Sequence, residues 1–146
     1  MKRRGLQLSK RHRRTLYAAG LTLLLSGVCW AWIQHLDQVG KAPEAARRCK
    51  TCLIAVHGWS AMLFVLLLGT VLAGHVRRGW HAGKNRKNGI FFLSVTALLT
   101  LSGYALYYVA DENWRALAAK FHWWLGIAAP ALLILHIRLG QRATVR

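Results

Sequence analysis

The sequence predicts an all-α membrane protein, folded as a bundle of four transmembrane helices. Hydrophobic residues make up 55% of the 146 residues, and they come in long blocks rather than in the stripes of amphipathic soluble helices. Each block is close to the ~20 residues that a helix needs to cross a bilayer. The basic residues between the blocks are also distributed unevenly. The expected spans are 15–34, 53–76, 89–109 and 116–137.

The first span follows a basic tail over residues 1–14, an order that secretory signal peptides share. Its apolar run of about 20 residues is longer than the ~7–15 residues of a typical signal core. The segment 28–32, Val-Cys-Trp-Ala-Trp, also offers no small-residue cleavage site. We therefore expect an uncleaved membrane anchor, and after the fourth span a short cytoplasmic tail over 138–146.

The net charge of +17 is distributed unevenly between the two sides of a four-span chain. One side receives most of the basic residues, namely Lys2, Arg3, Arg4, Lys10, Arg11, Arg13, Arg14, Arg77, Arg78, Lys84, Arg86, Lys87, Arg138, Arg142 and Arg146. The other side receives Lys41, Arg47, Arg48, Lys50, Arg115 and Lys120, together with every acidic residue, Asp37, Glu44, Asp111 and Glu112. This positive-inside pattern predicts that both termini lie in the cytoplasm. Because membrane anchoring accounts for the basic residues, we expect no nucleic-acid partner.

The second and fourth spans each contain a pair of histidines. His57 and His75 are 18 residues apart, which is five α-helical turns, and His122 and His136 are 14 residues apart, about 40° short of four turns. Each pair therefore shares a helix face, with the members about 27 Å and about 21 Å apart. Titratable residues inside membrane spans are rare and usually functional. Two such helices side by side predict two stacked bis-histidine sites, which suit haem.

The same two spans share a motif at each end. The segment 57–61 matches 122–126 as His-x-Trp-x-small, and 75–77 matches 136–138 as His-x-Arg. A repeat at both ends of two spans predicts two parallel helical hairpins, each contributing one histidine-bearing helix.

With these motifs, Cys52 to Gly140 resembles the four-helix di-haem cytochrome b superfamily. This superfamily includes bacterial cytochrome b561-like proteins and the membrane subunits of hydrogenases and formate dehydrogenases, and the likeness is greatest to its short His-x-Trp-Leu-Gly members. The resemblance implies two non-covalent b haems that carry electrons between the quinone pool and a redox partner protein. It implies that His57 and His122 hold the outer haem, and that His75 and His136 hold the inner one.

Other residues have more than one interpretation. Arg77 and Arg138, each two residues beyond an inner histidine, suit pairing with haem propionates and equally suit topology anchoring. The 18-residue spacing in the second span departs from the family pattern, so His35 at the outer end of the first span is the alternative outer ligand. His12 and His81 lie in basic segments and are expected at the solvated surface.

Cys49 and Cys52 form a Cys-x-x-Cys motif before the second span. Leu53 follows it where a c-type haem attachment motif has histidine. On the oxidising side we expect a disulfide, either structural or redox-active.

The sequence therefore supports three hypotheses about function. The leading one is an electron-transfer protein with two haems, or the cytochrome subunit of an oxidoreductase. Because its loops are too short for a substrate domain, we expect no catalytic residues in this chain. The alternatives are a quinone-linked thiol–disulfide oxidoreductase using Cys49 and Cys52, and a haem-free membrane scaffold subunit.

Overall fold

The computed structural model describes residues 9–81, 83 and 85–145, and all regular structure in this part of the chain is helical. The elements are α1 (Lys10–Gln38), α2 (Glu44–Val71), the π-helix η1 (Leu72–Val76), α3 (Arg77–His81), α4 (Arg86–Tyr108) and α5 (Glu112–Val145). Four helical stretches are long and apolar enough to cross a membrane: Lys10–Gln38, Glu44–His81, Arg86–Tyr108 and Glu112–Arg142. The prediction of an all-α chain with four apolar helices is confirmed to this extent.

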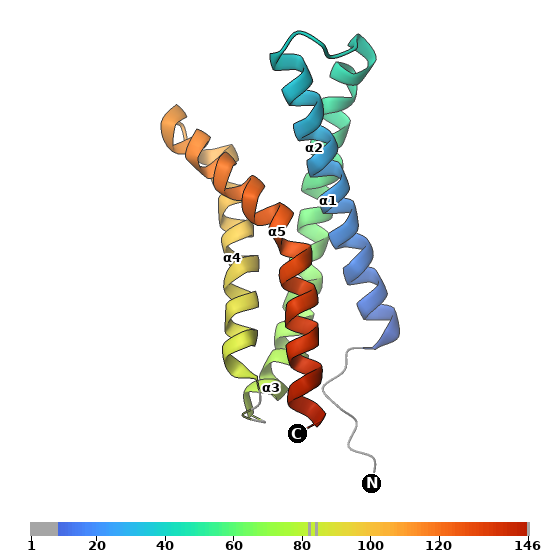
Figure 1. Ribbon diagram of the computed structural model, residues 1–146, viewed down its shortest axis with the longest axis vertical. Coiled ribbons are helices and arrows are strands. Elements are labelled where there is room, and N and C mark those ends of the chain that lie inside the picture. Colours follow the sequence, from blue (N-terminus) through green and yellow to red (C-terminus); the bar gives the residue numbers. More distant parts are fainter. Residues whose placement is uncertain (1–8, 82, 84, 146) are drawn as a thin grey trace. The chain divides into compact units, whose positions relative to one another are not determined.

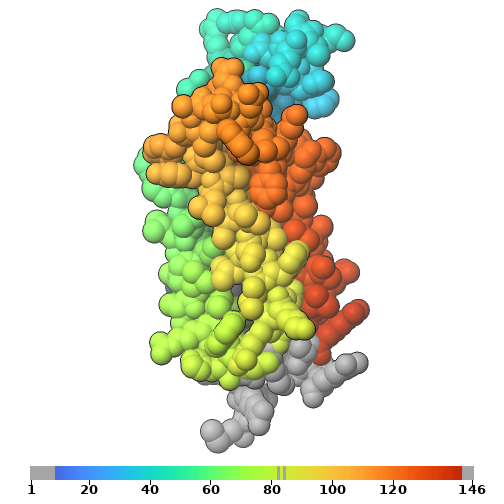
Figure 2. Space-filling model, turned by 90° about the vertical axis from the view of Figure 1, so that its left-hand side faces the viewer, coloured from blue at the N-terminus to red at the C-terminus, as the bar shows by residue number. Residues whose placement is uncertain are grey.

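The chain divides into two compact units after Val71. One unit contains α1 and α2, which run side by side (Figure 1). The other contains η1, α3, α4 and α5, and in it α4 packs along α5 (Figures 1 and 2). Each unit therefore includes one pair of long helices joined by a short connection.

Local signals set the turn within each pair. At the end of α1, Gly40 adopts a φ of +70°, a left-handed conformation that favours glycine. The Lys41 N–H donates to the Leu36 carbonyl (2.8 Å) and closes the helix end. Before α5, the Asp111 carboxylate accepts a hydrogen bond from the Trp114 N–H (2.9 Å) as an N-cap.

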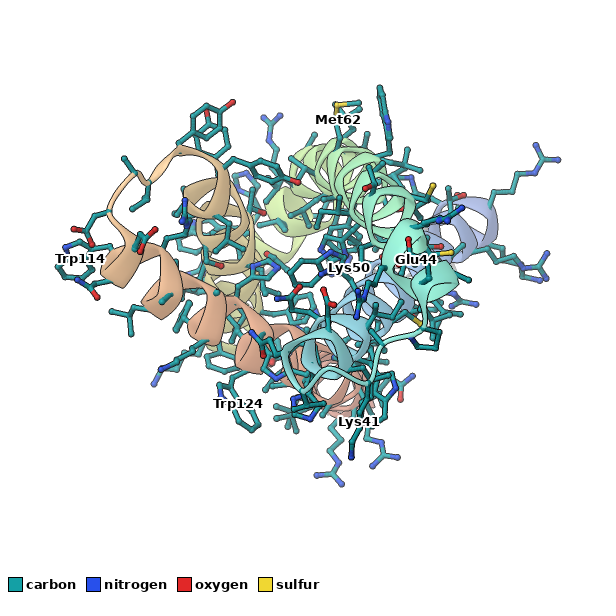
Figure 3. The ribbon with its side chains drawn as sticks, turned by 90° about the horizontal axis from the view of Figure 1, so that it is seen from above. Lys41, Glu44, Lys50, Met62, Trp114 and Trp124 are labelled. Atoms are coloured by element: carbon teal, nitrogen blue, oxygen red, sulfur yellow. The ribbon has the colours of Figure 1, made fainter. Side chains whose placement is uncertain are left out.

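Large apolar side chains point outward from the helices. Met62, Trp114 and Trp124 are 52%, 66% and 69% exposed, and Figure 3 shows them directed away from the helices that carry them. Among the described residues, no large side chain is fully buried. The buried positions are small or medium-sized, as at Ala19 and Ser26 in α1. Small residues between helices and large apolar residues outside suit a lipid environment.

The helices are longer than the predicted spans. The second helix begins at Glu44 rather than at 53, and α5 continues through the expected tail to Val145. Hydropathy marks only the apolar part of a helix, whereas Ala, Arg, Lys and Glu extend it into polar surroundings. Residues 1–8 of the expected basic tail lie outside the described residues. Pro130 lies inside α5, which bends along its length (Figure 1), as a mid-helix proline predicts.

The second span is not α-helical throughout. The expectation that His57 and His75 share one face assumes an α-helix along the whole segment between them. At Leu72–Val76, however, the backbone forms the π-helix η1. A π-turn closes i→i+5 rather than i→i+4 bonds and so changes the helical register. His75 lies inside this turn, so the two histidines are not related by five exact α-helical turns.

The charge pattern makes a prediction about topology. In spheroplasts treated with a membrane-impermeant reductant, a membrane-impermeant maleimide is expected to label the native Cys49 and Cys52, which are exposed in the first part of α2. In a background with all cysteines replaced by serine, Lys87→Cys in the basic segment is expected to react only after lysis, because basic residues stay in the cytoplasm. Labelling of Lys87→Cys in intact spheroplasts would reverse the predicted orientation.

Candidate functional site

His57 is held against α1 through one ring nitrogen. Its Nδ1 lies 3.1 Å from the hydroxyl of Ser26 and 3.1 Å from the Leu23 carbonyl oxygen. Ser26 is only 5% exposed, and its hydroxyl donates to the Thr22 carbonyl of its own helix (2.6 Å). A serine inside an apolar helix therefore anchors a histidine of the neighbouring helix.

His122 has the same arrangement in the other unit. Its Nδ1 lies 2.9 Å from the hydroxyl of Ser102 on α4. Ser102 is also buried, and its hydroxyl contacts the Leu99 carbonyl at 3.1 Å. The two units thus contain the same serine–histidine contact, once between α1 and α2 and once between α4 and α5.

These contacts favour one tautomer of both rings. A serine hydroxyl has one proton, and when a backbone carbonyl of the same helix receives it, the serine oxygen accepts from the histidine Nδ1–H. The Leu23 carbonyl can only accept, which again requires a proton on Nδ1 of His57. In the neutral imidazole Nε2 then carries the lone pair. This is the tautomer that ligates a metal through Nε2 while the other ring nitrogen donates to a neighbouring group.

A glycine follows each serine and lets the imidazole approach the helix. A Cβ placed on Gly27 would lie 3.2 Å from Cε1 of His57, and one placed on Gly103 would lie 3.2 Å from Cε1 of His122. Both distances are tighter than ordinary contact, so any larger residue would push the ring. Glycine at these positions therefore sets how closely each ring sits against the neighbouring helix.

The sequence records this arrangement as a repeated triplet, Leu-Ser-Gly, at 25–27 and at 101–103. The repeat of the second and fourth spans led to the histidines, but it did not lead to Ser26 and Ser102. A serine in an apolar span usually bonds to its own helix, so neither serine alone stands out. The signal that reveals them is the recurrence of the triplet in the first and third spans.

His136 is held differently. Its ring stacks on Phe92 of α4, with centroids 4.9 Å apart and planes 24° apart. The Asn88 side chain donates to the backbone carbonyl of His136 (3.1 Å). Its Nδ1 is buried and has no hydrogen-bond partner among the described residues. Since buried polar atoms nearly always have a partner, the ring of His136 is not satisfied by the described residues alone.

His75 lies in η1, in the same unit as His136. Both histidines therefore belong to one compact unit, and their pairing at an inner haem stays a prediction. π-Turns are frequent at functional sites. Arg77 and Arg138, the candidate propionate partners, are both exposed.

The remaining histidines lie in other settings. His35 is exposed near the end of α1, with its ring 6.3 Å from that of Trp32. His12 contacts the Thr70 hydroxyl through Nε2 (3.0 Å), and His81 is exposed at the end of α3. Neither His35 nor His81 has the serine and glycine neighbours found at His57 and His122.

Cys49 and Cys52 are exposed free thiols, three residues apart on α2. The disulfide expected between them stays a prediction. Cys29 on α1 is also a free, exposed thiol.

In the described part of the chain, no three His, Cys, Asp or Glu side chains gather in a way that would hold a bare metal ion. A haem iron needs only two protein ligands, because the porphyrin supplies the other four. No protein-family model, curated protein or solved structure matches this chain. The site is therefore interpreted from its own chemistry.

The serine contacts predict the tautomers of the haem-free protein. ¹⁵N NMR of histidine-labelled protein is expected to show His57 and His122 as neutral rings with the proton on Nδ1. Ser102→Ala is expected to shift the tautomer ratio of His122 about fivefold towards Nε2–H, because a hydrogen bond of roughly 1 kcal/mol is lost. The matched control is Ser94→Ala, an exposed serine on the same helix. A wild-type His122 protonated on Nε2 would contradict the assignment.

Proposed function

We propose that the protein is a membrane-bound b-type di-haem cytochrome that transfers electrons between the quinone pool and a redox partner. The observation that supports this most is the repeated serine–glycine arrangement around His57 and His122. In both units a buried serine lies within hydrogen-bond distance of the histidine Nδ1, an arrangement that suits a histidine ligating iron through Nε2. Structural histidines need only hydrogen bonds between helices, and nothing in that role calls for the same tautomer twice.

The ligand set fits haem b. Bound haem supplies reversible one-electron chemistry at its iron. For electron transfer both axial positions are best filled by strong ligands such as neutral imidazole, so that no substrate binds the iron. A hydrogen bond from Nδ1–H to a second group orients such a ligand and raises its basicity. Ser26 and Ser102 provide that second group for His57 and His122.

The proposed pairing follows the sequence: His57 with His122 for one haem and His75 with His136 for the other. For the second pair, support comes from the presence of both histidines in one compact unit and from the buried Nδ1 of His136, which has no hydrogen-bond partner among the described residues. Phe92 fixes the plane of the His136 ring. In this proposal His35 remains the alternative to His57, although it lacks the serine and glycine neighbours.

The other parts of the proposal concern where electrons enter and leave. The connections Val39–Pro43 and Val109–Asp111 are too short to form a substrate domain, so the terminal chemistry belongs to the partner. Arg77 and Arg138 are proposed to pair with haem propionates. In this reading the chain lies in the bacterial cytoplasmic membrane with both termini in the cytoplasm, and quinone reaches the haems from the lipid.

Haem content tests the proposal directly. Protein purified after expression with added haem is expected to show a b-type reduced-minus-oxidised spectrum and about two haems per chain by pyridine haemochrome. Replacing His57, His75, His122 or His136 singly by Ala is expected to remove about one haem each, because an iron needs both axial ligands. His81→Ala is the control for an exposed histidine, and His35→Ala separates the two outer candidates. Absence of haem from correctly inserted wild-type protein would favour the scaffold hypothesis.

The glycines give a more specific test. Gly27→Ala and Gly103→Ala are each expected to weaken the binding of one haem about tenfold, the effect of disturbing a group that orients a ligand, because the new methyl group displaces a ligand ring. The control is Gly58→Ala on α2, where an added Cβ meets no other part of the described chain within 4 Å. Haem retention during dilution, followed by absorbance, measures the effect. Equal retention in all three variants would show that the glycines do not position the ligands.

A further inference from the structure

The two thiols of the Cys-x-x-Cys motif lie on a regular helical turn. Cys49 and Cys52 are both inside α2, which begins at Glu44, and both are exposed. Lys50, between them, points instead towards α1 (Figure 3). The thiols are therefore accessible, while the turn that carries them is attached to the neighbouring helix.

The attachment is a small polar cluster centred on Asp37, which we call the Asp37 clamp: Asp37, Arg47, Lys50 and Gln34. The Asp37 carboxylate accepts from Arg47 Nε at 2.9 Å and from Lys50 Nζ at 3.0 Å. Lys50 Nζ also donates to the Gln34 side chain. The hydrogen bond from Lys50, with the nearby Arg47, holds the pKa of Asp37 below its usual range, so the carboxylate stays charged at neutral pH. The Asp37 clamp thus ties the end of α1 to the helical turn that includes the cysteines.

Helical geometry opposes a disulfide between these two cysteines. Side chains three residues apart on an α-helix have Cβ atoms about 5–6 Å apart, whereas a disulfide needs about 3.5–4.5 Å. Oxidation must therefore distort the turn, and a distorted disulfide is more easily reduced than a structural one. Any contact that stabilises the helical turn favours the dithiol.

We propose that Cys49 and Cys52 form a redox-active dithiol that exchanges with a disulfide-bearing partner, and that the Asp37 clamp sets the position of this exchange. One thiolate attacks the partner disulfide and releases one partner thiol, leaving a mixed disulfide. The second thiolate then attacks the Cys sulfur of the mixed disulfide and releases the second partner thiol. The dithiol is oxidised by two electrons, the partner disulfide is reduced by two, and the two thiol protons pass to the released thiols.

Equilibration with glutathione tests the dithiol. The full chain with Cys29→Ser, in lipid nanodiscs, is incubated in buffers of varied reduced-to-oxidised glutathione ratio and quenched with acid. Thiols are then tagged with a maleimide and counted by mass. We expect the pair to pass from dithiol to disulfide within the range of glutathione buffers, without stable glutathione adducts. A pair that stays oxidised throughout, or that yields only glutathione adducts, would overturn the proposal.

A second comparison tests the Asp37 clamp. Asp37→Asn removes a charge from the clamp without touching either cysteine, and it is expected to move the midpoint about two- to fivefold towards the disulfide, the scale of partly exposed ion pairs. Glu112→Gln is the matched control, since it also removes one acid, at the start of α5, where Glu112 forms an ion pair with the nearby Arg115. Equal midpoints for the two variants would refute a role for the clamp. Haem content, measured on the same samples, tests the cytochrome separately, because the exchange needs no haem.

Discussion

Polar groups inside apolar helices must find partners within the protein, and the serine–histidine hydrogen bonds are how this chain meets that constraint. A membrane interior provides no water for an imidazole N–H. The hydroxyls of Ser26 and Ser102 donate to backbone carbonyls of their own helices, and their oxygens can accept from the neighbouring histidine ring. The hydrogen bond that joins the two helices thus also favours one tautomer of the histidine. The packing of the helices and the proposed role of the histidine as a haem ligand depend on the same atoms.

Small residues make these serine–histidine contacts possible. Gly27 and Gly103 allow each imidazole to approach its serine without a side chain in the way. Close approach of helices through small residues is the usual means of packing in lipid, where no hydrophobic force drives helices together. Around His136 the means are different: a flat aromatic ring, Phe92, and a side-chain amide, Asn88, take the place of serine and glycine. The two histidines of α5 are therefore held by distinct kinds of contact.

The sequence predicted much of the fold but less of the site, for physical reasons. In lipid, a single apolar segment can pair its own backbone N–H and C=O groups only as a helix. The four long helices therefore followed from the four long apolar blocks. The histidines stood out because titratable residues are rare among apolar ones. Ser26 and Ser102 did not, because a serine's partner depends on which helix lies beside it. The π-turn around His75 also escaped prediction, because helical register is set by packing along the helix and leaves no simple mark in the sequence.

Helices α1 and α2 are held together at two places along their length. One lies beside the proposed redox-active cysteines and the other beside the proposed haem ligand His57. Near the connection between α1 and α2, the Asp37 clamp ties α1 to the turn that includes Cys49 and Cys52. Farther along α2, His57 is tied to α1 by its own contacts with Leu23 and Ser26. Distorting the cysteine turn loosens only the first attachment, because about one and a half helical turns separate Cys52 from His57. The helical pair can therefore change its thiol state while the histidine ring keeps its orientation and its tautomer.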